Sequence, residues 1–356
     1  MKYKNMAVYK IFPTKDASLY SEFPSMNTGL DAIIEASTYL KLGTPQVSRY
    51  LVQFSTTEIQ NLLNNRVNGA SFSSSLKNSA AVVTSLNLDT ELEVHTVSGS
   101  WGMGTGRYGN SPQTTNGTSW VWRSYSGSNA WLSTGSDSYP TPVYSQSFAY
   151  SDPIDVSVNV TPSILSWYSG SIPNDGFLIK QPSSVEFVQN SNVVSTFRYF
   201  SIDTQTIYPP SLEVSWDDYS FNTGSSPNTV LDTAETFMSI YNNVGTYYSQ
   251  SVARMRLAAI PKFPDRQFIT SSYYTTNYYL PESTSLYAIK DTETNEFVVD
   301  FDSNFTKISA DVTSSYFDVY MNGLEPERYY TVLIKTSLDG TTQVYDEDIM
   351  FKVING

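Results

Sequence analysis

The sequence contains no cysteine and a single histidine, His95. Without cysteine, neither a disulfide framework nor a thiolate metal site can form. One histidine cannot build the usual zinc sites, and it leaves His95 as the sole base for a histidine-assisted nucleophile. His95 alternates with Val94 in the strand-like run 92–97, which favours an ordinary strand residue that faces solvent or an interface.

Positive charge and long apolar runs are also scarce. The chain has 21 Lys and Arg against 34 Asp and Glu, a net charge of −13, and its basic residues are scattered. Phosphate binding needs clustered basic residues, so no direct nucleic-acid partner is predicted. No segment approaches the roughly 18 apolar residues that cross a bilayer, so no membrane insertion is predicted.

The first ten residues lack the apolar core of a secretory signal peptide. Two expectations are compatible with an N-terminus that lacks such a core. Either the protein is a virion component assembled in a host cytoplasm, or a leader has been removed from a mature chain.

Aromatic and small polar residues dominate instead. The 356 residues include 27 Tyr and 18 Phe, with abundant Ser, Thr and Asn, and only 15% are charged. Aromatic residues suit pleated, half-buried surfaces and small polar residues suit turns, so an all-β fold is predicted. The length allows roughly two domains with real cores.

Residues 1–216 are predicted to form a jelly-roll sandwich with one or two short helices. Ser55-Thr-Thr-Glu58 has the spacing of a capping box, so a short helix is expected to end near Asn65. Thr161 and Pro162 mark a second helix start, as N-cap and first residue. Its apolar face is expected to hold Ile164, Leu165 and Tyr168. Strands are expected at 7–12, 32–36, 47–54, 80–88, 92–97, 177–180 and 212–216.

The polar stretch 217–229 is predicted to be a linker, because Asn, Gly, Ser and Pro gather there. Residues 230–356 are predicted to form one or two smaller β-sandwich domains of the fibronectin or immunoglobulin type, from their regular strand spacing. At its start, the spacing of apolar residues from 237 to 244 permits either a helix or a strand.

Residues 98–151 form an aromatic-rich insertion in the first domain, with four of the six tryptophans. A disordered linker would avoid tryptophan, so an ordered, functional excursion is predicted. Three roles stay open for it: a protein–protein surface, a sugar-stacking platform or plain core packing. The candidate interaction residues are Trp101, Arg107, Tyr108, Trp120, Trp122, Arg123 and Trp131.

Four patches of the first domain together resemble a known family. They are 14–19 (TKDASL), 49–54 (RYLVQF), 159–162 (NVTP) with Trp167, and 174–180 (NDGFLIK). In this order they are similar to the DNRLRE-type β-sandwich, a jelly-roll module of extracellular and surface proteins. The resemblance implies a module that binds or supports and rarely catalyses, with a carbohydrate as its default partner.

The last hundred residues are similar to β-domains in structural proteins of large tailed bacteriophages. The matching pieces are 256–264 (RLAAIPKFP), 280–291, 301–309, 324–330 (LEPERYY) and 351–353. The Leu-x-Pro-x-x-x-Tyr piece that ends at Tyr330 also occurs in fibronectin-type sandwiches. There the tyrosine fills the core near a strand start.

Other chemistry has weaker support in the sequence. Calcium could bind Asp217-Asp218 or Asp346-Glu-Asp348, but neither has EF-hand spacing, so solvated charge is favoured and no cofactor is predicted. Gly102–Gly106 lacks the lysine and the helix of a phosphate loop and is interpreted as a flexible loop. A glycosidase needs only two carboxylates, and no motif singles out a pair among Asp16, Glu35, Asp155 and Glu213.

We therefore predict that the protein is not an enzyme but a structural subunit of a tailed-phage virion, located in the tail, in the neck or collar, or at the capsid. Its predicted partners are other virion proteins and further copies of itself, met through aromatic loops. The alternative is a carbohydrate-binding or adhesion module of a surface or virion protein, with a glycan as partner.

Overall fold

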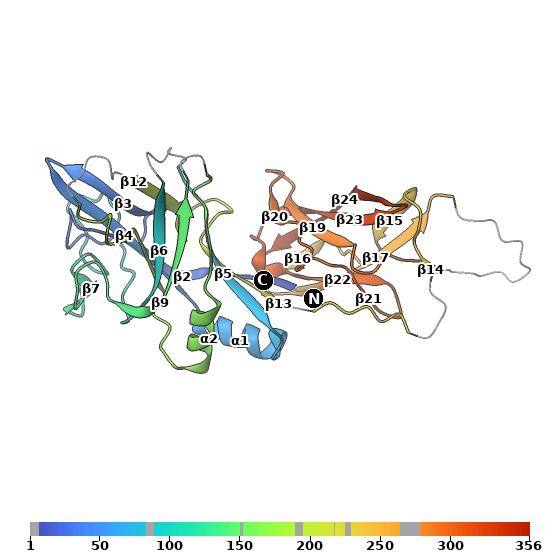
Figure 1. Ribbon diagram of the computed structural model, residues 1–356, viewed down its shortest axis with the longest axis horizontal. Helices are drawn as coiled ribbons and strands as arrows, with labels where there is room; N and C mark the ends of the chain where they lie inside the picture. The colour runs from blue at the N-terminus through green and yellow to red at the C-terminus, as the bar shows by residue number, and fades with distance from the viewer. Residues whose placement is uncertain are drawn as a thin grey trace, which may run out of the picture. The chain divides into compact units, whose positions relative to one another are not determined.

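The computed structural model describes residues 7–82, 89–149, 152–188, 195–216, 218–224, 229–263 and 278–356. Most of the regular structure in these ranges is β-strand, arranged in several sheets with two short α-helices (Figure 1). The chain divides into two compact units. The N-terminal unit comprises Ile11–Gly69 and Ser73–Val214, and the C-terminal unit comprises Met1–Lys10, Ala70–Phe72 and Ser215–Gly356. The predicted all-β class, with sandwich domains and one or two short helices, is confirmed.

The N-terminal unit contains a large and a small sheet. The large sheet has the order β12-β3-β4-β11-β6-β9, and β2 also pairs with β4. The small sheet has the order β1-β13-β5-β10, and the boundary between the units falls within β1 and β13. The strands are β1 (Ala7–Ile11), β2 (Pro13–Tyr20), β3 (Ile33–Lys41), β4 (Thr44–Phe54), β5 (Phe72–Asn78), β6 (Thr90–Val97), β9 (Ser138–Phe148), β10 (Val156–Asn159), β11 (Phe177–Lys180), β12 (Ser195–Phe200) and β13 (Ser211–Trp216).

One face of the large sheet packs into an aromatic core against the small sheet. Tyr50 of β4 lies opposite Ile179 of β11, and both are fully buried. The Tyr50 ring lies 5.7 Å from that of Tyr199 on β12, and its hydroxyl accepts a 2.5 Å hydrogen bond from Asn78 of β5. This face therefore forms the interior of the sandwich, as the alternation of β-strand side chains requires.

The opposite face of the large sheet is buried as well, under the aromatic-rich insertion. Leu51 of β4 and Leu178 of β11, which are paired across the strands, form a second core with Trp101, Trp120 and Trp131. All four residues of β11 are buried for this reason. The sheet is therefore the middle layer of three, and its central strands β4 and β11 are buried on both faces over most of their length.

The two predicted helices are present. The first is α1 (Thr56–Leu62), and the Ser55 side chain caps it by accepting from Glu58 N, as predicted; a π-helical turn (Leu63–Val67) follows. The second is α2 (Thr161–Ser169), which lies beside α1 (Figure 1). Its N-cap is Val160, so the predicted cap at Thr161 is wrong by one residue.

The buried face of α2 also differs from the prediction. Ile164 and Trp167 are buried, whereas Leu165 is 46% exposed and Tyr168 is 39% exposed. The Trp167 ring lies 4.7 Å from that of Phe177, and this contact sets the rotation of the helix. A helix of only nine residues has too few apolar positions for its pattern to fix that rotation.

The C-terminal unit is a two-sheet sandwich with the strand orders β15-β17-β22-β21 and β16-β24-β23-β19-β20. These orders match the ABED and GFC sheets of immunoglobulin-type domains. The strands are β15 (Thr236–Ile240), β16 (Thr246–Tyr248), β17 (Val252–Pro261), β19 (Leu286–Asp291), β20 (Phe297–Val299), β21 (Ser309–Ala310), β22 (Ser315–Tyr320), β23 (Tyr329–Leu338) and β24 (Thr341–Ile354). The short pair β14 (Thr229–Val230) and β18 (Tyr278–Tyr279) is parallel. Of the two possibilities left open for residues 237–244, the structure has a strand, β15.

Tyr330 plugs the core of this unit at the start of β23. Its side chain is 1% exposed, and its hydroxyl donates a 2.8 Å hydrogen bond to the carbonyl of Glu325, five residues earlier. This is the tyrosine corner of immunoglobulin-type sandwiches. The position agrees with the role that the Leu-x-Pro-x-x-x-Tyr piece predicts.

The division into units differs in detail from the sequence-based boundaries. The structure separates the units at Val214 and Ser215, and it places Met1–Lys10 with the C-terminal unit. The domain limits 1–216, 217–229 and 230–356 stay predictions, and residues 217 and 225–228 of the linker lie outside the described residues. So do residues 83–88 of the strand predicted at 80–88.

Candidate functional site

The aromatic-rich insertion is anchored to the turn before β3 by Asn27. This side chain is fully buried and donates hydrogen bonds to the carbonyls of Met103 (2.6 Å) and Thr118 (2.8 Å). Its Oδ1 accepts from Gly106 N at 2.8 Å, and a Cβ at Gly106 would lie 2.1 Å from the Asn27 carbonyl oxygen. Gly102–Gly106, interpreted from the sequence as a flexible loop, is instead a packed segment held by one buried amide.

The next turn carries Arg107 and Tyr108 to the surface. Tyr108 N lies 3.1 and 3.2 Å from the two carboxylate oxygens of Asp31. The Tyr108 ring packs edge-on against Tyr20 (5.1 Å between centroids) and Phe23 (5.8 Å), yet Tyr108 remains 49% exposed. Two of the seven predicted interaction residues therefore lie at the surface beside aromatic residues that precede β3.

Charged side chains from β3 and β12 surround this aromatic cluster. Glu22 pairs with Lys41 and accepts a hydrogen bond from the Tyr39 hydroxyl. Glu35 pairs with Arg198 at 2.7 Å and accepts from Ser37 at 2.6 Å. We call this surface the Tyr108 patch; it consists of Tyr20, Glu22, Phe23, Glu35, Tyr39, Lys41, Tyr108 and Arg198.

The patch raises the pKa values of its tyrosines and lowers the pKa of Glu22. Burial raises the pKa of Tyr39 above its usual value, and the neighbouring Glu22 raises it further. Burial likewise raises the pKa of Tyr108, with Glu22 and Glu35 adding to the shift. The hydrogen bond from Lys41 lowers the pKa of Glu22, followed by the bond from Tyr39. The surface can therefore offer phenolic donors and apolar ring faces next to carboxylates that are paired with cations.

Asp16 of β2 is a buried carboxyl on the sandwich side of this region. It is 1% exposed; Oδ2 accepts from Ile202 N at 2.7 Å, and Oδ1 has no hydrogen-bond partner among the described residues. Burial raises the pKa of Asp16 to about 7, against an ordinary value of 3.8, and the charges of Asp203 and Asp31 contribute in the same direction. Asp16 is thus a buried acid that titrates near neutrality.

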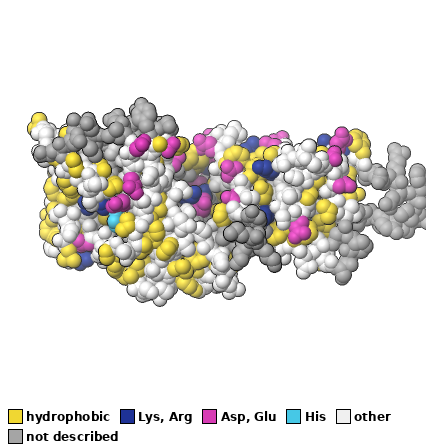
Figure 2. Space-filling model, viewed as in Figure 1, with side chains coloured by type: hydrophobic (Ala, Val, Ile, Leu, Met, Phe, Trp, Pro, Cys, Tyr) yellow, Lys and Arg dark blue, Asp and Glu magenta, His cyan; other side chains and the backbone are white. Residues whose placement is uncertain are grey.

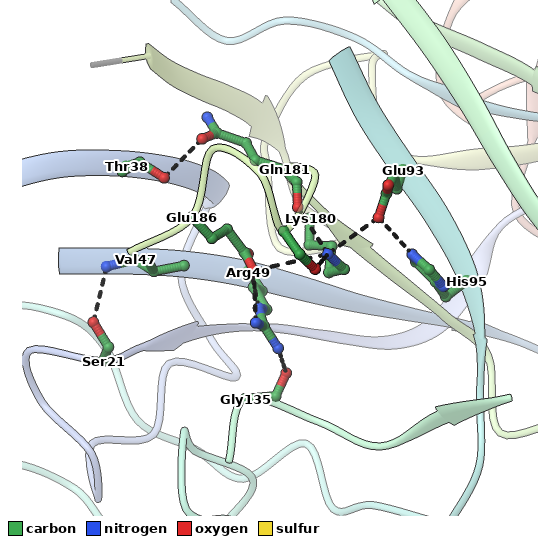
Figure 3. Close-up of polar contacts among 11 residues, drawn as sticks. Ser21, Thr38, Val47, Arg49, Glu93, His95, Gly135, Lys180, Gln181 and Glu186 are labelled. Atoms are coloured by element: carbon green, nitrogen blue, oxygen red, sulfur yellow. Dashed lines mark hydrogen bonds and ion pairs between the residues drawn. The ribbon is translucent and has the colours of Figure 1, made fainter. Parts of the chain in front are cut away.

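A second polar cluster lies on the insertion side of the large sheet (Figure 3), and its Arg49 guanidinium lies 5.0 Å from the centre of the Trp120 ring. Arg49 forms two hydrogen bonds with Glu186, at 2.9 and 2.7 Å, and donates a third to the Gly135 carbonyl at 2.9 Å. Lys180 lies 3.7 Å from Glu186 and 3.1 Å from Glu93. Because charges of opposite sign alternate, this chain of ion pairs holds the insertion and the loop after β11 to the sheet.

His95 ends this chain of charges. Its Nε2 lies 2.9 Å from Glu93 Oε2, and its side chain is 12% exposed. The histidine lies on the face of the sheet that the insertion covers, so of the two expectations for it, solvent or an interface, it does not face open solvent, and an interface stays a prediction. The expectation of a strand residue is confirmed, since β6 contains it.

Three of the predicted interaction residues are core residues. Trp101, Trp120 and Trp131 are 4%, 6% and 5% exposed. The indole nitrogens of Trp101 and Trp131 donate to the Asp175 and Ser119 carbonyls at 2.8 and 3.0 Å. Of the three roles left open for the insertion, core packing therefore describes these tryptophans, and a surface role stays a prediction for the remaining four residues.

Trp122 and Arg123 lie on a small hairpin of β7 (Trp122–Ser124) and β8 (Asn129–Ala130). The Trp122 ring packs edge-on against Tyr125, with 5.6 Å between centroids, and Tyr125 is 42% exposed. A Cβ at Gly99 would lie 2.7 Å from Arg123 Nη1, so the guanidinium covers that glycine. Both predicted residues are half-buried and form part of the hairpin surface.

The other candidate acids have structural partners. Asp155 accepts from Ala80 N at 2.7 Å, and Glu213 lies 3.9 Å from Lys77. Asp346 pairs with Lys290 at 2.9 Å, and Asp217 lies outside the described residues. Within the described ranges, no group of three or more histidines and acids is placed to hold a metal ion.

Sequence reasoning missed most of the Tyr108 patch. Tyr20, Phe23 and Tyr39 flank predicted strands without any motif, and Arg198 follows them by more than 150 residues. The one usable signal is Asn27-Thr28-Gly29, whose residues favour a turn but do not identify the anchor of a later segment. Pairing between distant strands brings these residues together, and no local pattern encodes it.

The exposed charges agree with the composition. On the face drawn in Figure 2, Lys and Arg side chains are dispersed among uncharged ones. In the part of the chain that the structure describes, no helix has both the length and the apolarity needed to cross a membrane.

Comparisons with known proteins add little. No protein-family model matches the chain, and no curated protein matches it. Among solved structures, a DUF4785 family protein from Legionella pneumophila aligns over 99% of this chain at 7% identity, with a TM-score of 0.20. This chain covers 65% of the length of that protein. So low a TM-score supports no argument about fold or function.

Proposed function

We propose that this protein is a non-catalytic structural subunit of a tailed-phage virion, which acts by docking onto other virion proteins. The Tyr108 patch is the observation that carries the docking part of the proposal, and the resemblance of the last hundred residues to phage structural domains carries the virion part. Tyrosine, phenylalanine and arginine are the residues enriched at the centres of protein interfaces, and charged groups there are paired. The patch combines an exposed tyrosine with the ion pairs Glu35–Arg198 and Glu22–Lys41.

Two further features support docking as the mode of action. Asn27 fixes the segment that carries Tyr108, so the patch is preorganised and little conformational entropy is lost on binding. The tryptophans of the insertion pack the insertion onto the sheet, which makes it a rigid layer instead of a mobile loop.

The test is quantitative mass spectrometry of purified particles of the phage that encodes the chain. We expect a fixed, integral number of copies per particle, and loss of the chain from particles when Tyr108→Ser is introduced. Tyr168→Ser is the matched control, because Tyr168 is 39% exposed but lies on α2, outside the aromatic-rich insertion. Absence of the wild-type chain from purified particles would overturn the proposal.

Glycan binding is the second candidate, and the same patch favours it. Sugar sites combine aromatic ring faces with carboxylates and other polar groups that fix hydroxyls. Retention of the purified chain on a glycan array, lost in Tyr108→Ser and kept in Tyr168→Ser, would support this function. No retention by the wild-type chain on any glycan would exclude it for the glycans tested.

A further inference from the structure

Two loops of the N-terminal unit meet beside the buried carboxyl of Asp16. The loop after β12 contributes Ile202, whose N–H donates the 2.7 Å hydrogen bond to Asp16 Oδ2. The residue before it, Ser201, is fully buried; its N–H donates to the Ala32 carbonyl at 3.1 Å, and its hydroxyl donates to the Asp31 carbonyl. The loop after β12 is therefore attached both to Asp16 and to the turn before β3.

The turn before β3 is attached in the same way to the aromatic-rich insertion. Tyr108 N lies 3.1 and 3.2 Å from the two carboxylate oxygens of Asp31, and Leu30 N donates to the Gly106 carbonyl at 2.9 Å. A chain of hydrogen bonds and short stretches of backbone thus connects Asp16 through Asp31 to Tyr108. A change at the buried carboxyl can reach the exposed patch along this chain.

Acidic groups surround Asp16, and each of the two loops brings one of them. Burial raises the pKa of Asp16, and the charges of Asp203 in the loop after β12 and of Asp31 in the turn raise it further. Burial also raises the pKa of Asp31 and of Asp203, while the charge of Arg107 acts in the opposite direction on both. From β4, Tyr50 faces the same carboxyl, and burial raises the pKa of its hydroxyl, with the Asp16 charge adding to the shift.

An ionised Asp16 is poorly accommodated while the two loops stay in place. Its Oδ1 has no hydrogen-bond partner among the described residues, and its Oδ2 accepts from Ile202 N. The strand side cannot move away, because β2 is paired with β4 along its length. The loops can, because Asp203 is exposed and Tyr108 is 49% exposed. Opening of the loops lets water reach the carboxylate, which lowers the cost of its charge.

We propose that Asp16 is a proton-controlled switch for the Tyr108 patch: the protonated side chain keeps the loop after β12 closed, whereas loss of the proton favours opening of that loop and, through Asp31, of the turn that carries Tyr108. The patch is then held most firmly at acidic pH and loosens toward neutral pH. Its effect on docking rests on the proposed function, but the opening itself does not.

Linkage gives the size of the expected effect. The pKa of Asp16 is about 7 in the closed form, and in an open, hydrated form it returns toward the ordinary 3.8. Because the closed form has the higher pKa, it is favoured fully below about pH 3.8, and this advantage is lost as the pH rises through about 7. Between pH 5 and pH 8 the equilibrium constant for opening should therefore rise about 80-fold, with little further change above pH 8.

Hydrogen exchange of the full chain, followed by mass spectrometry between pH 5 and pH 8, tests the proposal. Protection factors, corrected for the intrinsic exchange rate at each pH, are compared for segments 197–205 and 103–112. We expect protection at the amides of Ile202 and Tyr108 to fall by about 80-fold across this range. Strand β23 of the C-terminal unit serves as an internal reference and should not follow this profile.

Three variants separate the switch from a general effect of pH. Asp16→Asn keeps the shape and the acceptor but cannot ionise, so both segments should stay protected without this pH dependence. Glu213→Gln is the matched control, because this carboxylate on β13 is partly exposed, and it should keep the wild-type profile. Asp203→Asn changes an exposed residue and removes a charge that raises the pKa of Asp16, so the loss of protection should level off at a lower pH. This last variant tests the switch even if Asp16→Asn does not fold.

The possible outcomes also distinguish this inference from the proposed function. Protection that does not depend on pH in either segment of the wild type, or an Asp16→Asn variant with the wild-type profile, overturns the switch. A loss of protection at 197–205 without one at 103–112 overturns the transmission through Asp31. A switch that operates in a chain absent from purified particles is retained and refutes the virion role. A chain that is found in particles and shows no pH dependence does the reverse.

Discussion

Replacing Asp16 by asparagine should make the N-terminal unit more stable at alkaline pH. Asp16 is 1% exposed, accepts one hydrogen bond from Ile202 N, and has one oxygen without a partner among the described residues. Ionising such a group places a negative charge where water cannot solvate it, and a single hydrogen bond compensates little of that cost. Asparagine keeps the shape and the acceptor and has no charge to bury.

The magnitude follows from the pKa of Asp16, about 7 in the folded protein against an ordinary 3.8. Because the folded pKa is the higher, Asp16 contributes stability that is fully present below about pH 3.8 and is lost as the pH rises through about 7. At about 1.4 kcal/mol per pKa unit, the loss reaches about 4 kcal/mol at pH 8.5. An unpaired amide N–H in the variant costs about 1–3 kcal/mol, which leaves a net gain of about 1–3 kcal/mol.

Urea unfolding followed by tryptophan fluorescence, between pH 4.5 and pH 8.5, measures the effect. Five of the six tryptophans belong to the N-terminal unit, so the signal reports mainly on that unit. Asp16→Asn should equal the wild type or fall slightly below it at pH 4.5 and exceed it at pH 8.5. The difference between variant and wild type isolates this group, since all other titrations are common to both.

Glu213→Gln is the control, because this carboxylate has a partly exposed side chain and only a 3.9 Å ion pair with Lys77. Its effect should stay below about 1 kcal/mol. The reasoning is refuted if Asp16→Asn shifts stability by the same amount at pH 4.5 and pH 8.5, or if it destabilises the unit at pH 8.5.

Three further substitutions probe the buried polar groups. Asn27→Ala should cost about 3 kcal/mol or more, since it leaves the Met103 and Thr118 carbonyls without their buried donor, and hydrogen exchange at residues 103–118 should accelerate. Lys180→Met should cost about 3 kcal/mol in urea unfolding, because it leaves two acidic side chains without their shared cation. Tyr330→Phe should cost about 1 kcal/mol in thermal unfolding of the C-terminal unit, through the lost bond to the Glu325 carbonyl.

Each of these substitutions has a control of the same chemistry at an exposed site. Asn116→Ala, Lys41→Met and Tyr329→Phe should each change stability by less than about 1 kcal/mol. Unchanged exchange at 103–118 in Asn27→Ala would show that Asn27 does not hold this segment to the rest of the unit. A Lys180→Met variant as stable as the wild type would mean that the ion pairs merely offset their own desolvation. Equal effects of Tyr330→Phe and Tyr329→Phe would show that the hydrogen bond from Tyr330 to the Glu325 carbonyl does not stabilise the unit.

Local patterns predicted the local features well. Ser55 and Glu58 identified the start of α1, because a capping box satisfies the free N–H groups at a helix start with side chains close in sequence. The fibronectin-type piece that ends at Tyr330 predicted a tyrosine near a strand start, and in the structure its hydroxyl reaches a carbonyl only five residues away. Both interactions lie within a few residues of chain, where sequence spacing is also spatial spacing.

The candidate site was predicted only in part, for an equally physical reason. The sequence identified the insertion and its aromatic residues but could not divide Trp120 and Trp131 in the core from Tyr108 at the surface. That division depends on which face of the large sheet the insertion covers. Whether each of these side chains is buried or exposed is decided only when the chain has formed the three-layer arrangement.

The sequence by itself determined the all-β class, both short helices and the dominance of aromatic residues, because composition, turn residues and capping spacings act over short stretches of chain. Only the tertiary structure decided the burial of three tryptophans, the titration of Asp16 near neutrality and the exposure of Phe237 beside Ile260. Each of these depends on strands distant in sequence that pair or stack on one face. Burial and electrostatic environment are properties of that assembled surface, so they emerge only when the sheets have formed.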